Sequence, residues 1–159
     1  MTFQRIFAAL DRSDLAPEVF AQALNLAQNA QPGAALKLFH CLPLDSQMLS
    51  PYASGAGEEL LGFAQNLQER LQGESRDIQR WLEDYAQQAQ AAGVTAEWDW
   101  ALGEPGRQIR DVAQRWQADL IIIGRRGLQG FAEMVLGSVS NYIVHQAPCS
   151  VLIIQTPRV

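Results

Sequence analysis

Apolar positions follow two different periods along this chain, and the two periods alternate. Short runs of apolar and β-branched residues predict five strands, over 5–10, 35–41, 95–101, 118–124 and 150–154. Apolar residues spaced by three and four predict helices over 14–30, 58–92, after the GEPG at 103–106, and 138–146. Strands separated by helices are typical of βαβ units, so we expect an α/β fold with a doubly wound, parallel, five-stranded sheet and helices on both faces.

The long polar region 58–92 carries two groups of apolar residues that share one helix face. These are Leu60, Phe63, Leu67 and Leu71, then Ile78, Trp81, Leu82, Tyr85 and Ala89. We interpret the stripe as core packing, with a surface for a partner helix as the alternative. The QGES at 72–75 is expected to bend or interrupt the helix. Residues 43–57 are rich in Ser, Pro, Gly and Tyr and predict a variable surface loop within a single domain over 1–159.

Charge and composition exclude several classes of function. The net charge is −5 and the pI is about 4.9, a balance that argues against a nucleic-acid or acidic-membrane surface. No apolar run reaches 18 residues and the first residues lack a signal-peptide layout, so we expect a cytoplasmic protein without a membrane span. Cys41 and Cys149 are too few for a disulfide framework, and no His/Cys spacing suits a metal.

The predicted carboxyl ends of three strands carry distinctive residues, and ligands bind at such ends in open parallel sheets. The first ends at Asp11, the second at His40 and Cys41, and the fourth at Gly124. A glycine-rich loop then contains Gly127 and Gly130, and a helix opens at Gly137-Ser138, with Ser140 close behind. Backbone N–H groups at spaced glycines and at a helix N-terminus suit a polyphosphate, with Arg125 and Arg126 as optional charge. Alternatively, the glycines form a turn and Ser138 is a helix cap.

Familiar phosphate sites fit this chain poorly. A P-loop needs Gly-Lys-Ser/Thr, but the only lysine, Lys37, lies inside the second predicted strand. The dinucleotide fingerprint and the flavodoxin site place phosphate after the first strand, where Asp11 and Asp14 would repel it. A receiver-domain phosphoacceptor site is also a poor match, because it usually enlists a lysine near the last strand and this chain has none there.

The pattern Gly124-x2-Gly127-x9-Gly137-Ser138, with Val139 and Ser140 after it, resembles the ATP-binding signature of the universal stress protein family. Nearly the whole chain shares this resemblance, including RIFAALDRSD, LFHCLPL, GEPGRQI and LGSVSNYIVHQAPCSVLII. Ser150 stands where many members have proline. The resemblance implies the ATP-binding branch, with a nucleotide-binding α-hydrolase-like fold and the strand order 3-2-1-4-5.

The resemblance also implies roles for individual residues. Asp11 would accept hydrogen bonds from the ribose or the adenine edge, Ala9 would flank the base, and the Cys41 backbone would read adenine. Gly124, Gly127 and Gly130 would line the ribose and phosphates. Gly137, Ser138, Val139 and Ser140 would hold the outer phosphates, with Mg²⁺ bound through the phosphates of ATP. The resemblance further implies a homodimer joined through the last strand, which is apolar here.

The leading hypothesis is a stress-response regulator that binds ATP or a related adenine nucleotide, with slow or no hydrolysis, because no general base or activating lysine stands near the loop. One alternative is a weak ATPase, or a protein that phosphorylates itself on Ser138 or Ser140. Another is a nucleotide-independent dimeric scaffold. We interpret His40 as a packed or hydrogen-bonded strand-end residue, and His145 as exposed or at an interface. Cys149 is expected to fill core space, and Trp98 and Trp100 to pack on the sheet.

Overall fold

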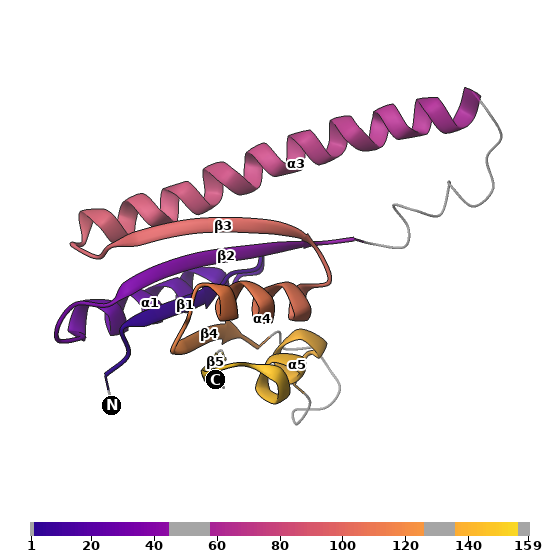
Figure 1. Cartoon of the computed structure of the whole chain (residues 1–159). Coiled ribbons are helices and arrows are strands. Elements are labelled where there is room, and N and C mark those ends of the chain that lie inside the picture. Colours follow the sequence, from indigo (N-terminus) through magenta and orange to yellow (C-terminus); the bar gives the residue numbers. More distant parts are fainter. Residues whose placement is uncertain (1, 45–57, 126–135, 156–159) are drawn as a thin grey trace.

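All five strands run in the same direction within one sheet, in the order β3-β2-β1-β4-β5 (Figure 1). This computed structural model describes residues 2–44, 58–125 and 136–155. The strands are β1 Arg5–Ala9, β2 Ala35–Pro43, β3 Ala96–Gly103, β4 Leu120–Gly124 and β5 Ser150–Ile154. The fold class and strand order expected from the sequence are therefore confirmed.

In the described part of the chain, helices cover both faces of the sheet (Figure 1). The helices α1 (Ala16–Asn29) and α3 (Glu58–Ala91) pack on one face, and α4 (Pro105–Arg115) and α5 (Ser138–Gln146) on the other. Successive side chains of a strand point to opposite faces. In β1, Ile6 and Ala8 accordingly join the cluster under α1 and α3, whereas Phe7 and Ala9 join the cluster under α4 and α5. Burial on both faces explains the continuously apolar strands.

The expected interruption of the long helix at 72–75 is wrong, because α3 is continuous over 34 residues. Gly73 is exposed, and the Ser75 hydroxyl donates a hydrogen bond to the Gln72 carbonyl oxygen at 3.0 Å. A single glycine in a helix interior costs only about 1 kcal/mol relative to alanine. The packing of the following turns outweighs that cost.

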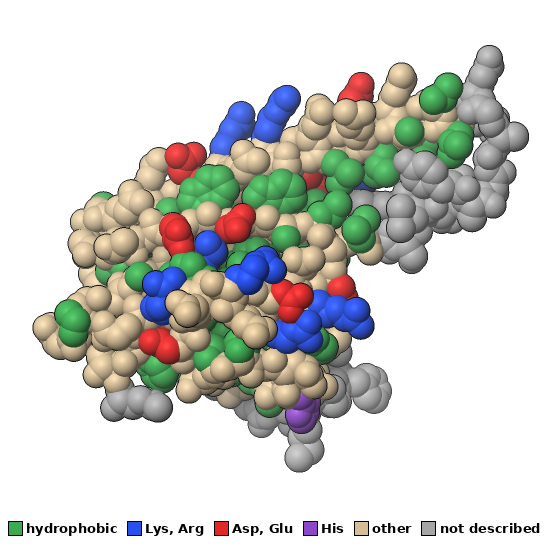
Figure 2. All heavy atoms as spheres, in the orientation of Figure 1, with side chains coloured by type: hydrophobic (Ala, Val, Ile, Leu, Met, Phe, Trp, Pro, Cys, Tyr) green, Lys and Arg blue, Asp and Glu red, His purple; other side chains and the backbone are tan. Residues whose placement is uncertain are grey.

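The two halves of α3 have different surroundings. In the second half, Ile78, Leu82 and Ala89 are buried in the core, so core packing is confirmed there. The first half extends past the end of β3 (Figure 1), and hydrophobic side chains continue along it (Figure 2). Leu67 and Leu71 are only half-buried and line a groove of about 390 Å³ together with Trp100. The stripe is thus core at one end and a shallow apolar groove at the other.

The two edge strands of the sheet differ in character. On β3, Trp98 and Trp100 pack against the core as expected, while Glu97 and Asp99 are exposed on the other face. Strand β5 is the opposite edge, and its apolar residues from Val151 to Ile154 are half-buried. Within the described ranges, no helix combines the length and the apolar character that crossing a bilayer requires.

Candidate functional site

A cavity of about 500 Å³ lies at the carboxyl ends of β1, β2 and β4, beside the N-termini of α4 and α5. The strand order reverses between β1 and β4, and such a switch point is where open α/β sheets bind their ligands. The described residues that line it are Ala9, Leu10, Asp11, Phe39, His40, Cys41, Pro43, Pro105, Ile109, Ile123, Gly124, Gly137, Ser138, Val139 and Ser140.

Eight of the ten candidate residues from the sequence meet around this cavity. They are Ala9, Asp11, Cys41, Gly124, Gly137, Ser138, Val139 and Ser140. The other two, Gly127 and Gly130, lie outside the described residues, as does Arg126. Residues 115 positions or more apart in the sequence are therefore brought to one end of the sheet by the parallel topology.

The N-terminus of α5 opens on the cavity without a side-chain cap among the described residues. Gly137 is the N-cap, and the first intrahelical bond runs from the Asn141 amide to the Gly137 carbonyl oxygen at 2.9 Å. The amides of Ser138, Val139 and Ser140 precede that bond, in the turn where a helix has no acceptor of its own. The buried Ser140 hydroxyl donates to the Gly137 carbonyl at 3.0 Å and so fixes this turn. Ser138 is the first helical residue rather than the cap.

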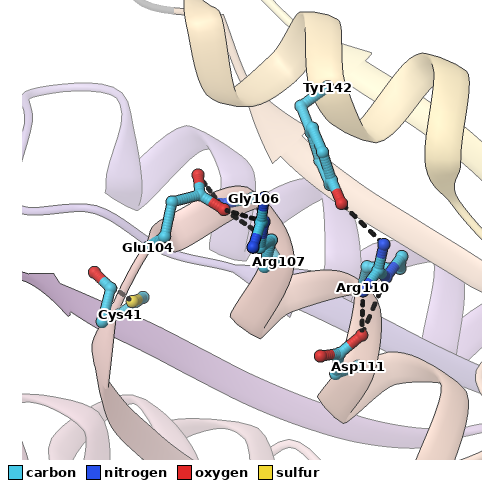
Figure 3. Close-up of polar contacts among 8 residues, drawn as sticks. Cys41, Glu104, Gly106, Arg107, Arg110, Asp111 and Tyr142 are labelled. Carbon is cyan, nitrogen blue, oxygen red and sulfur yellow. Dashed lines mark hydrogen bonds and ion pairs between the residues drawn. The ribbon is translucent and has the colours of Figure 1, made fainter.

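The N-terminus of α4 is different, because a carboxylate of the chain already occupies it (Figure 3). Glu104 accepts hydrogen bonds from the Gly106 amide at 3.0 Å and from the Arg107 amide at 2.8 Å. Pro105 occupies the first turn, where a missing N–H costs nothing. The sequence analysis missed this cap, for which Glu-Pro at a helix start is the only signal. Of the two helix N-termini beside the cavity, α5 is the one left to receive an anion.

The Cys41 thiol is held in its neutral form. Burial, followed by the charge of nearby Glu104, raises the pKa of Cys41 to about 11. Its Sγ donates to the Gly103 carbonyl oxygen at 3.6 Å, and the side chain is buried. A protonated thiol engaged in this way offers neither a nucleophile nor a metal ligand. The contribution of Cys41 to the cavity is therefore its shape and its backbone.

Asp11 lies on the turn that follows β1, and its carboxylate organises that turn. It accepts a hydrogen bond from the Ser13 amide at 3.1 Å and another from the Ser13 hydroxyl. Helix α1 begins at Ala16, two residues after the expected start at position 14, and its N-terminus has no side-chain cap. The Ser13 hydroxyl donates to Asp11 and also accepts from the Leu15 amide at 3.3 Å, ahead of the helix.

At Gly124 the neighbouring side chains at the start of α1 leave little room for a Cβ atom. A Cβ at this position would stand 2.8 Å from Leu15 Cδ2 and 3.2 Å from Val19 Cγ2, both at the start of α1. A side chain here would force Leu15 and Val19 to shift, so close packing at the start of α1 favours glycine, and Gly124 lies at the cavity wall. At Gly137 a Cβ would meet only Ser140 Oγ at 3.7 Å, an ordinary contact.

The remaining candidate residues have ordinary surroundings. His40 is buried and hydrogen-bonded, as interpreted from the sequence, but it does not end its strand, because β2 continues to Pro43; His145 is exposed on α5. Cys149 packs against the core cluster under α4 and α5. No group of three or more His, Cys, Asp or Glu side chains in the described part of the chain is arranged to hold a metal ion.

Comparison with known proteins agrees with this geometry. A model of the universal stress protein family matches residues 2–155. The universal stress protein Sll1388 of Synechocystis is 50% identical over 155 residues, covering 98% of this chain and 99% of that protein.

Two solved structures are similar to the chain over nearly its whole length. A universal stress protein in complex with cAMP has a TM-score of 0.68 at 22% identity and covers 99% of this chain and 100% of that one. The universal stress protein from Archaeoglobus fulgidus in complex with dAMP has a TM-score of 0.57 at 20% identity and covers 96% and 98%. The family model that matches residues 2–155 and the 50% identity to Sll1388 show that the chain belongs to the universal stress protein family.

Proposed function

We propose that the chain is a single-domain regulatory protein that binds ATP, with Mg²⁺, in the cavity at the switch point of the sheet. The observation that carries this proposal is the N-terminus of α5, which has no side-chain cap among the described residues and lies on the same cavity of about 500 Å³ that Asp11 lines. An anion receptor and a carboxylate at separate parts of one cavity suit a phosphorylated nucleoside, whose phosphates and hydroxyl groups need opposite partners.

Each part of the lining has a counterpart in an adenine nucleotide. Ile109, Ile123 and Val139 supply apolar walls for a base. Asp11 supplies an acceptor for ribose hydroxyls, and the backbone amides of α5 face the phosphates. Mg²⁺ would be held by the phosphates, with the Ser138 hydroxyl within its water shell. The relatives in complex with cAMP and dAMP support an adenine nucleotide as the ligand class.

Slow or absent hydrolysis belongs to the same proposal. Lys37, the chain's one lysine, pairs with Glu97 at 3.4 Å and does not line the cavity. Among the described lining residues, Asp11 is the only carboxylate, and the proposal assigns it to the nucleoside rather than to an attacking water. A turnover of ordinary enzyme size, roughly 1–10³ per second, would contradict this part of the proposal.

Mass spectrometry of small molecules released from the purified protein, prepared with and without Mg²⁺, tests the ligand. The expected result is an adenine nucleotide in amounts that approach one per chain. If a different phosphorylated compound is released, that compound rather than ATP is the ligand. Transfer of labelled γ-phosphate to the protein, lost in S138A or S140A, would favour the self-phosphorylating alternative. Partner binding that is the same with and without nucleotide would favour a scaffold.

A homodimer joined through β5 and a cytoplasmic stress-response role complete the proposal. Strand β5 is a sheet edge with half-buried apolar side chains, and unprotected edges invite pairing with a second copy. Light scattering at micromolar concentration should give twice the chain mass of 17.6 kDa. A mass of one chain would contradict the dimer and leave nucleotide binding untouched.

A further inference from the structure

The peptide between Leu10 and Asp11 is where the chain leaves the sheet and enters the cavity rim. Pairing of β1 with β2 ends at Ala9 and Phe39, and the Leu10 amide adds one more bond, to the Phe39 carbonyl oxygen at 2.8 Å. The Leu10 carbonyl then lies beyond the end of the ladder, although Leu10 is buried. A buried carbonyl oxygen needs a donor.

His40 supplies that donor from the neighbouring strand. Its Nδ1 lies 2.8 Å from the Leu10 carbonyl oxygen, and because a carbonyl can only accept, Nδ1 carries the proton. The imidazole is buried, and its ring meets the Trp81 ring of α3 edge-on, with centroids 5.5 Å apart. Both backbone groups of Leu10 are therefore tied to β2, one by the strand and the other by the His40 side chain.

The turn that begins at this peptide presents the Asp11 carboxylate. The hydrogen bond to the Leu10 carbonyl restrains the plane of the Leu10–Asp11 peptide, which is the unit from which the Asp11 Cα and its side chain extend. Ser13 holds the carboxylate from the other side. Arg12, between them, lies over the Trp81 ring at 5.7 Å from its centroid, so the same indole supports both the imidazole and the turn.

We infer that His40 is a positioning residue for ribose recognition: its Nδ1–H aims the Asp11 carboxylate at the ribose hydroxyls of the bound nucleotide. The inference rests on the proposed function, since it concerns how that site distinguishes a ribonucleotide from a nucleotide whose sugar lacks the 2′ and 3′ hydroxyl groups. His40 acts through the Leu10–Asp11 peptide. It needs no contact with the ligand.

The test compares the affinities of the full chain for ATP and for 2′,3′-dideoxy-ATP by titration calorimetry. Hydrogen bonds to a carboxylate are strong enough that wild-type protein should prefer ATP by about tenfold or more. D11A should bring the ratio close to one. H40Q, whose amide sits at the position of Nε2, should lower the ratio to near the D11A value, while H40N, whose amide sits at the position of Nδ1, should keep it.

A purely structural role of His40 predicts a different pattern. The matched control is I78V, which trims a fully buried residue of α3 on the same face of the sheet and should lower the thermal midpoint without changing the ratio. The ¹⁵N shifts of His40 should also report the tautomer with the proton on Nδ1. H40N decides the question even if H40Q does not fold.

The outcomes separate the two proposals. If wild-type protein binds ATP and dideoxy-ATP equally, or if H40Q keeps the wild-type ratio, the inference about His40 is overturned and nucleotide binding stands. A folded H40N that loses the preference also overturns it. If wild-type protein binds neither nucleotide, the proposed function itself is overturned.

Discussion

A carboxylate at position 138 should change folding and nucleotide binding in opposite directions. Ser138 is the first residue of α5, is exposed, and lines the cavity. In S138D a negative charge stands at the positive end of the helix, which stabilises a helix by about 0.3–1 kcal/mol. The same charge repels any anion that the first amides of α5 hold. Binding should therefore weaken while the fold becomes slightly more stable.

The size of the binding effect follows from simple electrostatics. At a separation of about 6 Å and an effective dielectric constant of about 20–40, two unit charges interact by roughly 1.4–2.8 kcal/mol. This corresponds to a 10- to 100-fold loss of affinity, on the order of one decade per 1.4 kcal/mol. Because the site is partly open to solvent, the loss should shrink as the salt concentration rises.

Titration calorimetry with ATP in the absence of Mg²⁺, where no cation offsets the repulsion, and urea unfolding without ligand measure the two effects on the same protein. S138N is the neutral variant of similar size and should bind within a few-fold of wild type. Q88E adds the same charge at an exposed position of α3 and controls for net charge. If S138D binds ATP as tightly as S138N, the phosphates do not lie at α5, and the central reasoning about this helix is refuted.

Further predictions concern Gly106 in the first turn of α4 and Cys41 of β2. In G106A a Cβ would stand 2.7 Å from Cδ1 and 2.9 Å from Cγ of the Tyr142 ring, so urea unfolding should show a loss of about 1–3 kcal/mol. G33A, whose Cβ meets no atom within 4 Å, should be neutral, and the G106A cost should vanish in a Y142A background; a cost that persists there contradicts the packing reason. For Cys41, with its pKa raised to about 11, alkylation in a C149S background should still rise about tenfold per pH unit between pH 8 and 10, and a plateau below pH 9 would contradict the neutral thiol. The raised pKa also sets how stability depends on pH. Below pH 9 the Cys41 thiol is protonated in both the folded and the unfolded chain. As the pH rises from about 9 through 11, the unfolded chain loses this proton first, so the free energy of unfolding falls.

Much of the fold could be predicted from the sequence because its strands are buried on both faces. The continuously apolar run from Ile121 to Ile123 indicates a strand covered on both faces, and five predicted strands alternating with helices leave few topologies, although the edge strand β3 alternates instead. The continuity of α3 could not be predicted, because the effect of Gly73 depends on packing that the local sequence does not contain. The start of α1 lies at Ala16 rather than at the predicted position 14, because the chain first forms a turn in which the Ser13 amide and hydroxyl donate to Asp11.

The candidate site, like the fold, could be predicted from the sequence only in part. The spacing from Gly124 to Ser138, together with the strand-end residues Asp11 and Cys41, indicated which residues would meet. The apolar lining by Pro43 and Ile109, and the occupation of the α4 N-terminus by Glu104, arise only when segments distant in sequence come together. Even at Gly124 the structure supplies a reason that spacing could not, the contact of α1 with the end of β4.

The most direct test of the central claim is a calorimetric titration of ATP into purified, ligand-free protein, with and without Mg²⁺. The account predicts saturable binding of one nucleotide per chain, and without Mg²⁺ an affinity about 10- to 100-fold weaker in S138D but unchanged in Q88E. The absence of saturable binding up to about 1 mM ATP, a free energy weaker than about −4 kcal/mol, would contradict it.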